Sequence, residues 1–92
     1  MGPVADRLRD ALQHSFEPER LEIQDDSSRH AGHAGARPEG ESHFTVTIVS
    51  SAFSGVSRVE RQRRVYAALS AELAGPVHAL SLKALAPGEA GA

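Results

Sequence analysis

The chain has 92 residues, a formal net charge of −2 and no cysteine; 40% of its residues are hydrophobic and 24% are charged. This length predicts one domain with a thin core, and the near-neutral charge excludes a general attraction to nucleic acid or anionic lipid. The lack of cysteine excludes disulfides and any iron–sulfur cluster held by the chain's own thiolates. No apolar run approaches the roughly 20 residues that span a bilayer, so we expect a cytoplasmic protein without a membrane partner.

A helix and a short strand are expected first along the chain. Val4, Leu8 and Leu12 recur at helical spacing, with charged residues on the other face. This pattern predicts a helix of about three turns that ends before Pro18. Residues 21–24 then alternate between apolar and polar, which predicts a short strand.

Residues 25–42 combine glycine, proline and polar side chains without any apolar period, which predicts a long loop. Loops of this length are uncommon in compact domains and are often functional. His30 and His33 have an H-x-x-H spacing within it. Imidazole is a common metal ligand, but most such pairs are solvated loop residues, so the spacing alone is a weak indication of metal binding.

A second strand and a second long helix are expected next. Phe44, Val46 and Ile48 alternate with polar residues and predict a strand with one buried face. A turn with a short helical piece follows over 50–56. Ser57 with a glutamate three residues later is a capping box, which predicts a helix that runs to about residue 74 and stops at a Gly-Pro pair.

The helical period assigns the side chains of this second helix to two faces. Arg61 and Arg64 are predicted on the outer face. The residues predicted on the inner arc are Val59, Gln62, Val65, Tyr66, Leu69 and Leu73.

A third strand over 77–85 places His78, Leu80 and Leu82 on one face. The order helix, strand, strand, helix, strand predicts an α+β fold with both helices on one face of a three-stranded mixed sheet. The last two strands suit a parallel pair with a right-handed crossover. We expect one domain over residues 1–87 and a flexible tail over 88–92.

Four short motifs in this order resemble the BolA family, over roughly Val4 to Pro87. They read Ser42-His43-Phe44, Phe53-x-Gly55, Arg61-x-Arg63 and Val77-His78-Ala79-Leu80, and the loop with histidines is similar to the histidine-bearing branch. The resemblance implies a fold similar to the class II KH domain. It also implies a partnership with monothiol glutaredoxins that carry a CGFS site. One position departs, because the family usually has Arg-His-Arg where this chain has Gln62 in the middle.

In the family, such a pair holds a [2Fe–2S] cluster for iron–sulfur trafficking or iron homeostasis. The glutaredoxin cysteine and glutathione serve one side, and BolA histidines serve the other. The resemblance therefore implies His78 as one metal ligand and His30 or His33 as the other, without choosing between the two. Without the resemblance, a structural histidine would be the better interpretation of His78. His43 is interpreted as structural or as part of the rim.

The second helix carries four arginines, and a solvated face is their simplest interpretation. They could also bind the glutaredoxin or glutathione through carboxylates, or bind nucleic-acid phosphates. Binding to nucleic-acid phosphates gives the alternative function, a BolA-type DNA-binding transcriptional regulator. The family's role as regulators in the stress response also supports this alternative. These residues are Arg58, Arg61, Arg63 and Arg64.

No sequence feature indicates catalysis. A nucleophile–base pair, a phosphate-binding glycine loop and an H-E-x-x-H motif are all missing from the sequence. We therefore predict a binding protein that is not an enzyme and has no catalytic residues. Alone, it is expected to hold no tightly bound metal and to be a monomer or a weak homodimer.

Overall fold

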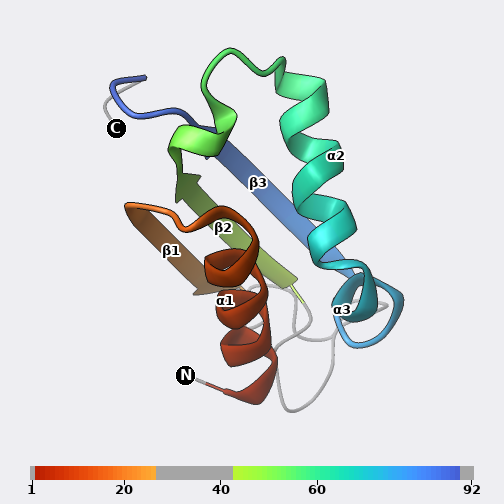
Figure 1. Cartoon of the computed structure of the whole chain (residues 1–92). Coiled ribbons are helices and arrows are strands. Elements are labelled where there is room, and N and C mark those ends of the chain that lie inside the picture. Colours follow the sequence, from red (N-terminus) through yellow and green to blue (C-terminus); the bar gives the residue numbers. More distant parts are fainter. Residues whose placement is uncertain (1, 27–42, 90–92) are drawn as a thin grey trace.

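The computed structural model of the chain describes residues 2–26 and 43–89 (Figure 1). The elements are α1 (Pro3–Phe16), β1 (Arg20–Asp25), β2 (His43–Val49), the 3-10 helix η2 (Ser51–Phe53), α2 (Arg58–Ala68), α3 (Ser70–Ala74) and β3 (Ala79–Leu85). The expected order of helices and strands is confirmed, and so is the short helical piece after the second strand. The second long helix is divided at Leu69 into α2 and α3.

The sheet is mixed and has the strand order β1-β2-β3. β1 pairs with β2 in antiparallel orientation, whereas β2 pairs with β3 in parallel, with His43 opposite Ala79. Both α1 and α2 cover the same face of this sheet (Figure 1). The predicted α+β class and the parallel pair joined by a helical crossover are therefore confirmed.

The core lies between this face and the helices. Phe44, Val46 and Ile48 of the central strand are buried, as their alternation predicts. Leu8 and Leu12 of α1 have no exposed surface. Among the described residues, all the buried hydrophobic side chains except Val49 form one cluster, as a single thin core requires.

The turn after β2 ties the end of α1 to the sheet. Phe53 of η2 is fully buried, and its ring centroid lies 5.0 Å from that of Phe16. The buried Ser50 hydroxyl donates a hydrogen bond to the Phe16 carbonyl oxygen over 2.6 Å and accepts one from the Ala52 N–H over 3.1 Å. This end of the domain is therefore held by both apolar packing and buried hydrogen bonds.

The predicted helix cap is present. The Ser57 hydroxyl accepts a hydrogen bond from the Glu60 N–H over 3.2 Å at the start of α2, which satisfies one of the free N–H groups of the first turn. At the other end Gly75 caps α3, and its N–H donates to the Glu72 carbonyl oxygen.

The predicted inner arc of α2 is wrong in part. Val59 is 63% exposed and Tyr66 39% exposed, and Gln62 is exposed too, whereas Arg61 is buried next to Val65 on the inner face. Apolar periodicity places a charged residue outside by default. In the structure α2 is instead oriented with Arg61 toward the inside of the domain, because polar partners there form hydrogen bonds with its guanidinium.

The third strand is shorter than predicted. It begins at Ala79, and Val77 lies before it as a buried anchor whose N–H donates to the Glu72 carbonyl oxygen. His78 is therefore not part of the strand or of its buried face, and its side chain is exposed. Leu80 and Leu82 are half-buried on the helix-covered face, as expected. Of the helices in the described ranges, none combines the length and apolar character needed to cross a membrane.

Candidate functional site

Two histidines meet where β2 and β3 begin. The rings of His43 and His78 are stacked, with 6.3 Å between their centroids and 19° between their planes. Parallel strands begin at the same edge of a sheet, and His43 opens β2 opposite the first residue of β3. The neighbours of His78 are fixed, since Val77 is buried and Ala79 is in the sheet ladder. The backbone of His78 is thus held on both sides while its imidazole reaches solvent.

The two residues that flank the 27–42 segment, Asp26 and His43, lie together at this edge. The Asp26 N–H donates a hydrogen bond to the His43 carbonyl oxygen over 2.7 Å. The Thr45 hydroxyl donates another to the Asp26 carboxylate. Residues 26 and 43, which flank the 27–42 segment, are therefore joined to each other at the end of the sheet where His78 lies. His30 and His33, predicted as loop ligands, lie outside the described residues.

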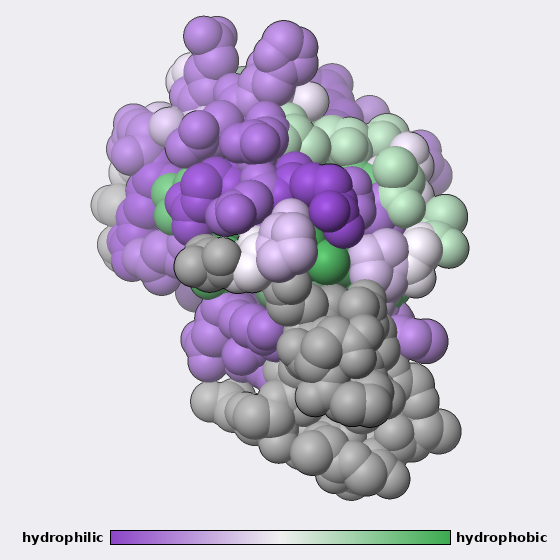
Figure 2. All heavy atoms as spheres, turned by 90° about the horizontal axis from the view of Figure 1, so that it is seen from below, coloured by the Kyte–Doolittle hydropathy of each residue, from purple (hydrophilic) through white to green (hydrophobic). Residues whose placement is uncertain are grey.

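This end of the molecule offers nitrogen donors and needs further ligands to hold a metal. Within residues 2–26 and 43–89, no group of three or more histidine, cysteine, aspartate or glutamate side chains is placed to hold a metal ion. Figure 2 looks onto this end and shows that hydrophilic side chains cover most of its described surface, while less polar ones gather on one side. An exposed imidazole on such a surface can bind a metal together with ligands from another molecule.

Fewer of the four arginines of α2 are available as a positive surface than the sequence predicts. Arg63 and Arg64 are exposed, but both pair with Glu60, at 3.7 Å and 3.3 Å respectively. Such surface pairs contribute little to stability, yet the shared carboxylate offsets part of the positive charge. Arg58 is exposed at the start of α2.

The Arg61 side chain is buried in the domain. Its predicted place on the outer face of the helix is therefore wrong. Its guanidinium donates to the carbonyl oxygens of Val56, over 2.8 Å, and Ala84, over 3.1 Å. It also forms two parallel bonds with the Glu89 carboxylate, of 2.6 Å and 3.0 Å. Glu89 in turn accepts a hydrogen bond from the Ala86 N–H over 2.8 Å. Arg61 thus joins the start of α2 to the end of β3, and the predicted tail is attached at least as far as Glu89.

We expect this attachment to depend on pH. The hydrogen bonds from Arg61 and from the Ala86 N–H lower the pKa of Glu89 to about 2. Because the folded-state pKa lies below the unfolded value of about 4.3, the stabilisation is complete above about pH 5 and is lost as the pH falls toward 2. A Glu89→Gln variant should have a lower urea midpoint than the wild type at pH 7, and the two should converge near pH 2. A constant difference over this range would contradict the assignment.

Sequence reasoning did not place His43 beside His78. The available signal was its place at the first residue of a strand, with the predicted parallel partner strand preceded by a second histidine. Only the register, with His43 opposite Ala79, shows that the two rings are neighbours.

Fold and site together define a small α+β domain with a three-stranded mixed sheet and, at one end, a stacked pair of histidines of which His78 is exposed. The chain belongs to the BolA-like protein family, whose conserved region matches residues 12–89. It is 46% identical over 89 residues to BolA-like protein 1 of Bos taurus, a match that covers 97% of this chain and 63% of the bovine protein. The chain thus spans less than two thirds of that relative.

Two further relatives extend the comparison. The solved BolA domain of SufE1 from Arabidopsis thaliana superimposes with a TM-score of 0.86 at 43% identity, covering 97% of this chain and 98% of that domain. The DNA-binding transcriptional regulator BolA of Escherichia coli is 40% identical over 79 residues, which cover 86% of this chain and 71% of the regulator. The predicted family and the predicted fold are confirmed.

Proposed function

We propose that this chain binds a monothiol CGFS glutaredoxin and shares a [2Fe–2S] cluster with it for iron–sulfur trafficking or iron homeostasis. The observation that carries the proposal is the exposed imidazole of His78, held on a fixed backbone beside His43, in a chain without thiolates. The family membership supports it, since the chain resembles BolA proteins in the motifs that include His78.

The donor chemistry of the chain suits half of a shared cluster. Iron–sulfur clusters are normally held by cysteine thiolates, and imidazole replaces thiolate on one iron in clusters of raised potential. The thiolates would come from the glutaredoxin and glutathione, and this chain would supply neutral nitrogen. His78 is the rigid donor, because its backbone is fixed on both sides.

The second donor is proposed to be His30 or His33. His30 is four residues from Asp26, and a chain of that length spans at most about 14 Å. Because Asp26 is hydrogen-bonded to His43, this limit keeps His30 within reach of the histidine edge. Fixing a loop residue costs about 1–2 kcal/mol, so metal affinity should be weak in the isolated chain.

The proposal is tested by mixing the purified chain with a CGFS glutaredoxin, glutathione, iron and sulfide. Visible absorption and circular dichroism are recorded beside a sample of the glutaredoxin alone. We expect a new spectrum at one-to-one stoichiometry and co-elution of the two proteins. An unchanged spectrum with separate elution would refute the pairing.

A DNA-binding regulator is the second candidate, favoured by the name of the Escherichia coli relative and by the exposed Arg58, Arg63 and Arg64. Binding through these arginines should weaken steeply with salt, because each neutralised phosphate contributes a slope of about −0.9 in log K against log salt. Cluster sharing should instead depend on glutathione and on the histidines. A salt titration with duplex DNA therefore separates the two functions.

A further inference from the structure

β3 forms one of the two edges of the sheet, and within residues 2–26 and 43–89 its one strand partner is β2. An edge strand presents a row of N–H and C=O groups to any extended chain that approaches. The Ala84 carbonyl oxygen accepts from the Arg61 guanidinium, whereas the Leu85 carbonyl oxygen accepts from Ser50 on the β2 side. Since successive residues of a strand point their backbone groups to opposite sides, Leu80 and Leu82 direct theirs outward, as Ala84 does.

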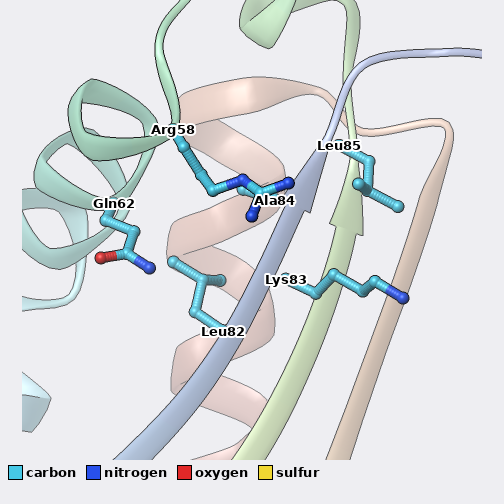
Figure 3. A pocket seen from close by; sticks show the side chains of 6 residues that line it. All are labelled: Arg58, Gln62, Leu82, Lys83, Ala84 and Leu85. Atoms are coloured by element: carbon cyan, nitrogen blue, oxygen red, sulfur yellow. The ribbon is translucent and has the colours of Figure 1, made fainter. Parts of the chain in front are cut away.

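A groove of about 240 Å³ runs between this strand and α2. On the helix side it is lined by Arg58 and Gln62, one turn apart, and on the strand side by Leu82 and its neighbours through Leu85. Figure 3 shows the guanidinium of Arg58 extended from α2 toward Ala84 and the Gln62 amide directed to the same space. The groove thus places polar side chains next to the free strand edge.

Exposed apolar side chains lie on α2 next to Gln62. Val59 and Tyr66 are the large hydrophobic residues that the described structure leaves exposed, at 63% and 39%. Each lies three or four residues from Gln62, so all three share one side of the helix. Exposed apolar residues beside an unpaired strand edge are features of a peptide-binding surface.

Two cationic residues, Arg58 and Lys83, line the groove. Figure 3 shows the Lys83 side chain extended away from Arg58, so the charge that faces the Gln62 side of the groove is that of Arg58. In the described part of the chain, Arg61 is bound to Glu89, and Arg63 and Arg64 share Glu60. Arg58 forms no hydrogen bond or ion pair with a described residue, although its charge attracts Glu89, which is itself bound to Arg61. A single guanidinium suits one carboxylate, which it can bind through two parallel hydrogen bonds.

We propose that the groove between α2 and β3 binds an extended, acidic peptide segment of a partner protein, added as a strand along β3. One carboxylate of the peptide binds Arg58, its backbone pairs with the outward groups of Leu80 and Leu82, and its apolar side chains contact Val59 and Tyr66. This proposed peptide site is separate from the proposed cluster ligand, because His78 precedes the start of β3 and Arg58 lies near the end of that strand. The proposal therefore does not rest on cluster sharing.

Charge disfavours the other occupants of the groove. Two copies of the chain paired antiparallel through β3 would place one Arg58 at each end of the strand pair, and the groove lining has no carboxylate to bind it. Single-stranded nucleic acid would need several cations along its backbone, whereas the groove is lined by Arg58 and Lys83 alone among cationic residues, and the Lys83 side chain extends away from Arg58 (Figure 3). An acidic peptide has the matching charge and the hydrogen-bonding backbone.

The test uses the full chain labelled with nitrogen-15 and a capped octapeptide that alternates valine with threonine and glutamate. Titration should shift the amide signals of Leu80 and Leu82 together with those of Val59, Gln62 and Tyr66. Arg58→Ala should weaken binding about fivefold or more, as expected for loss of a charge-assisted hydrogen bond. Arg63→Ala is the matched control, since it removes an equal charge from the same helix, and it should leave the affinity unchanged.

Changes in the peptide test the proposal without any substitution that could alter the fold of the protein. Methylation of the peptide nitrogens that face β3 should abolish binding, whereas methylation of the alternate nitrogens should be tolerated. Replacement of the peptide glutamates by glutamine should weaken binding as much as Arg58→Ala does. The proposal is overturned if the shifts map elsewhere or if both methylation patterns act alike. It is also overturned if an octanucleotide gives these shifts and the peptide does not, or if sedimentation shows self-association through this edge.

Discussion

Replacement of His78 by alanine is expected to abolish the spectrum of the cluster shared with the glutaredoxin. Under the proposed function, His78 supplies the rigid nitrogen ligand on this side of the cluster, and alanine has no donor. The neighbouring Ala79 and Val77 would stay fixed in the ladder and the core, so the substitution removes the donor without moving the backbone that carries it. The measurement is visible circular dichroism of the reconstituted pair, with iron and sulfide quantified for each variant.

Two histidine controls separate ligation from general effects. His14→Ala removes an exposed imidazole from the last turn of α1 and should leave the spectrum unchanged. His43→Ala removes the ring stacked on His78 and should retain the cluster, since His43 is interpreted as a rim residue. Because His78 is exposed, its replacement should change the free energy of unfolding by no more than about 0.5 kcal/mol. A normal cluster in the His78→Ala pair would remove this residue from the ligand set.

Truncation of Phe53 to alanine is expected to have the largest effect on stability. Phe53 is fully buried and its ring packs 5.0 Å from that of Phe16, where the end of α1 meets the turn after β2. Loss of a buried phenylalanine side chain costs about 3–5 kcal/mol, through lost burial and the cavity that remains. A domain of this size has about 5–15 kcal/mol in total, so the variant should be close to unfolding. Urea denaturation measures the difference directly.

The matched control is Val59→Ala, which removes apolar atoms from a side chain that is 63% exposed. Its unfolding free energy should stay within about 0.5 kcal/mol of the wild type. Phe53→Leu should fall between the two, because leucine fills part of the cavity. Equal midpoints for Phe53→Ala and Val59→Ala would contradict the packing seen at this end of the core.

The elements that sequence alone determined are those whose signal is local. Period-two alternation in β2 places Phe44 and Ile48 in the core, and the Ser57 cap marks the start of α2. The alternation, cap and crossover length together determined the order of elements and the α+β class. The short motifs, among them the one around His78, determined the family.

What only the tertiary structure decided depends on contacts distant in sequence. Arg61 is buried because carbonyl groups and Glu89, 28 residues away, satisfy its guanidinium, and no periodicity within the helix encodes such partners. His43 and His78 become neighbours through the parallel register of two strands. That Arg58 has no ion pair among the described residues likewise depends on which carboxylates the other arginines bind. Hydropathy patterns report how often a residue type is buried, whereas partners for a buried charge arise only when the chain is folded.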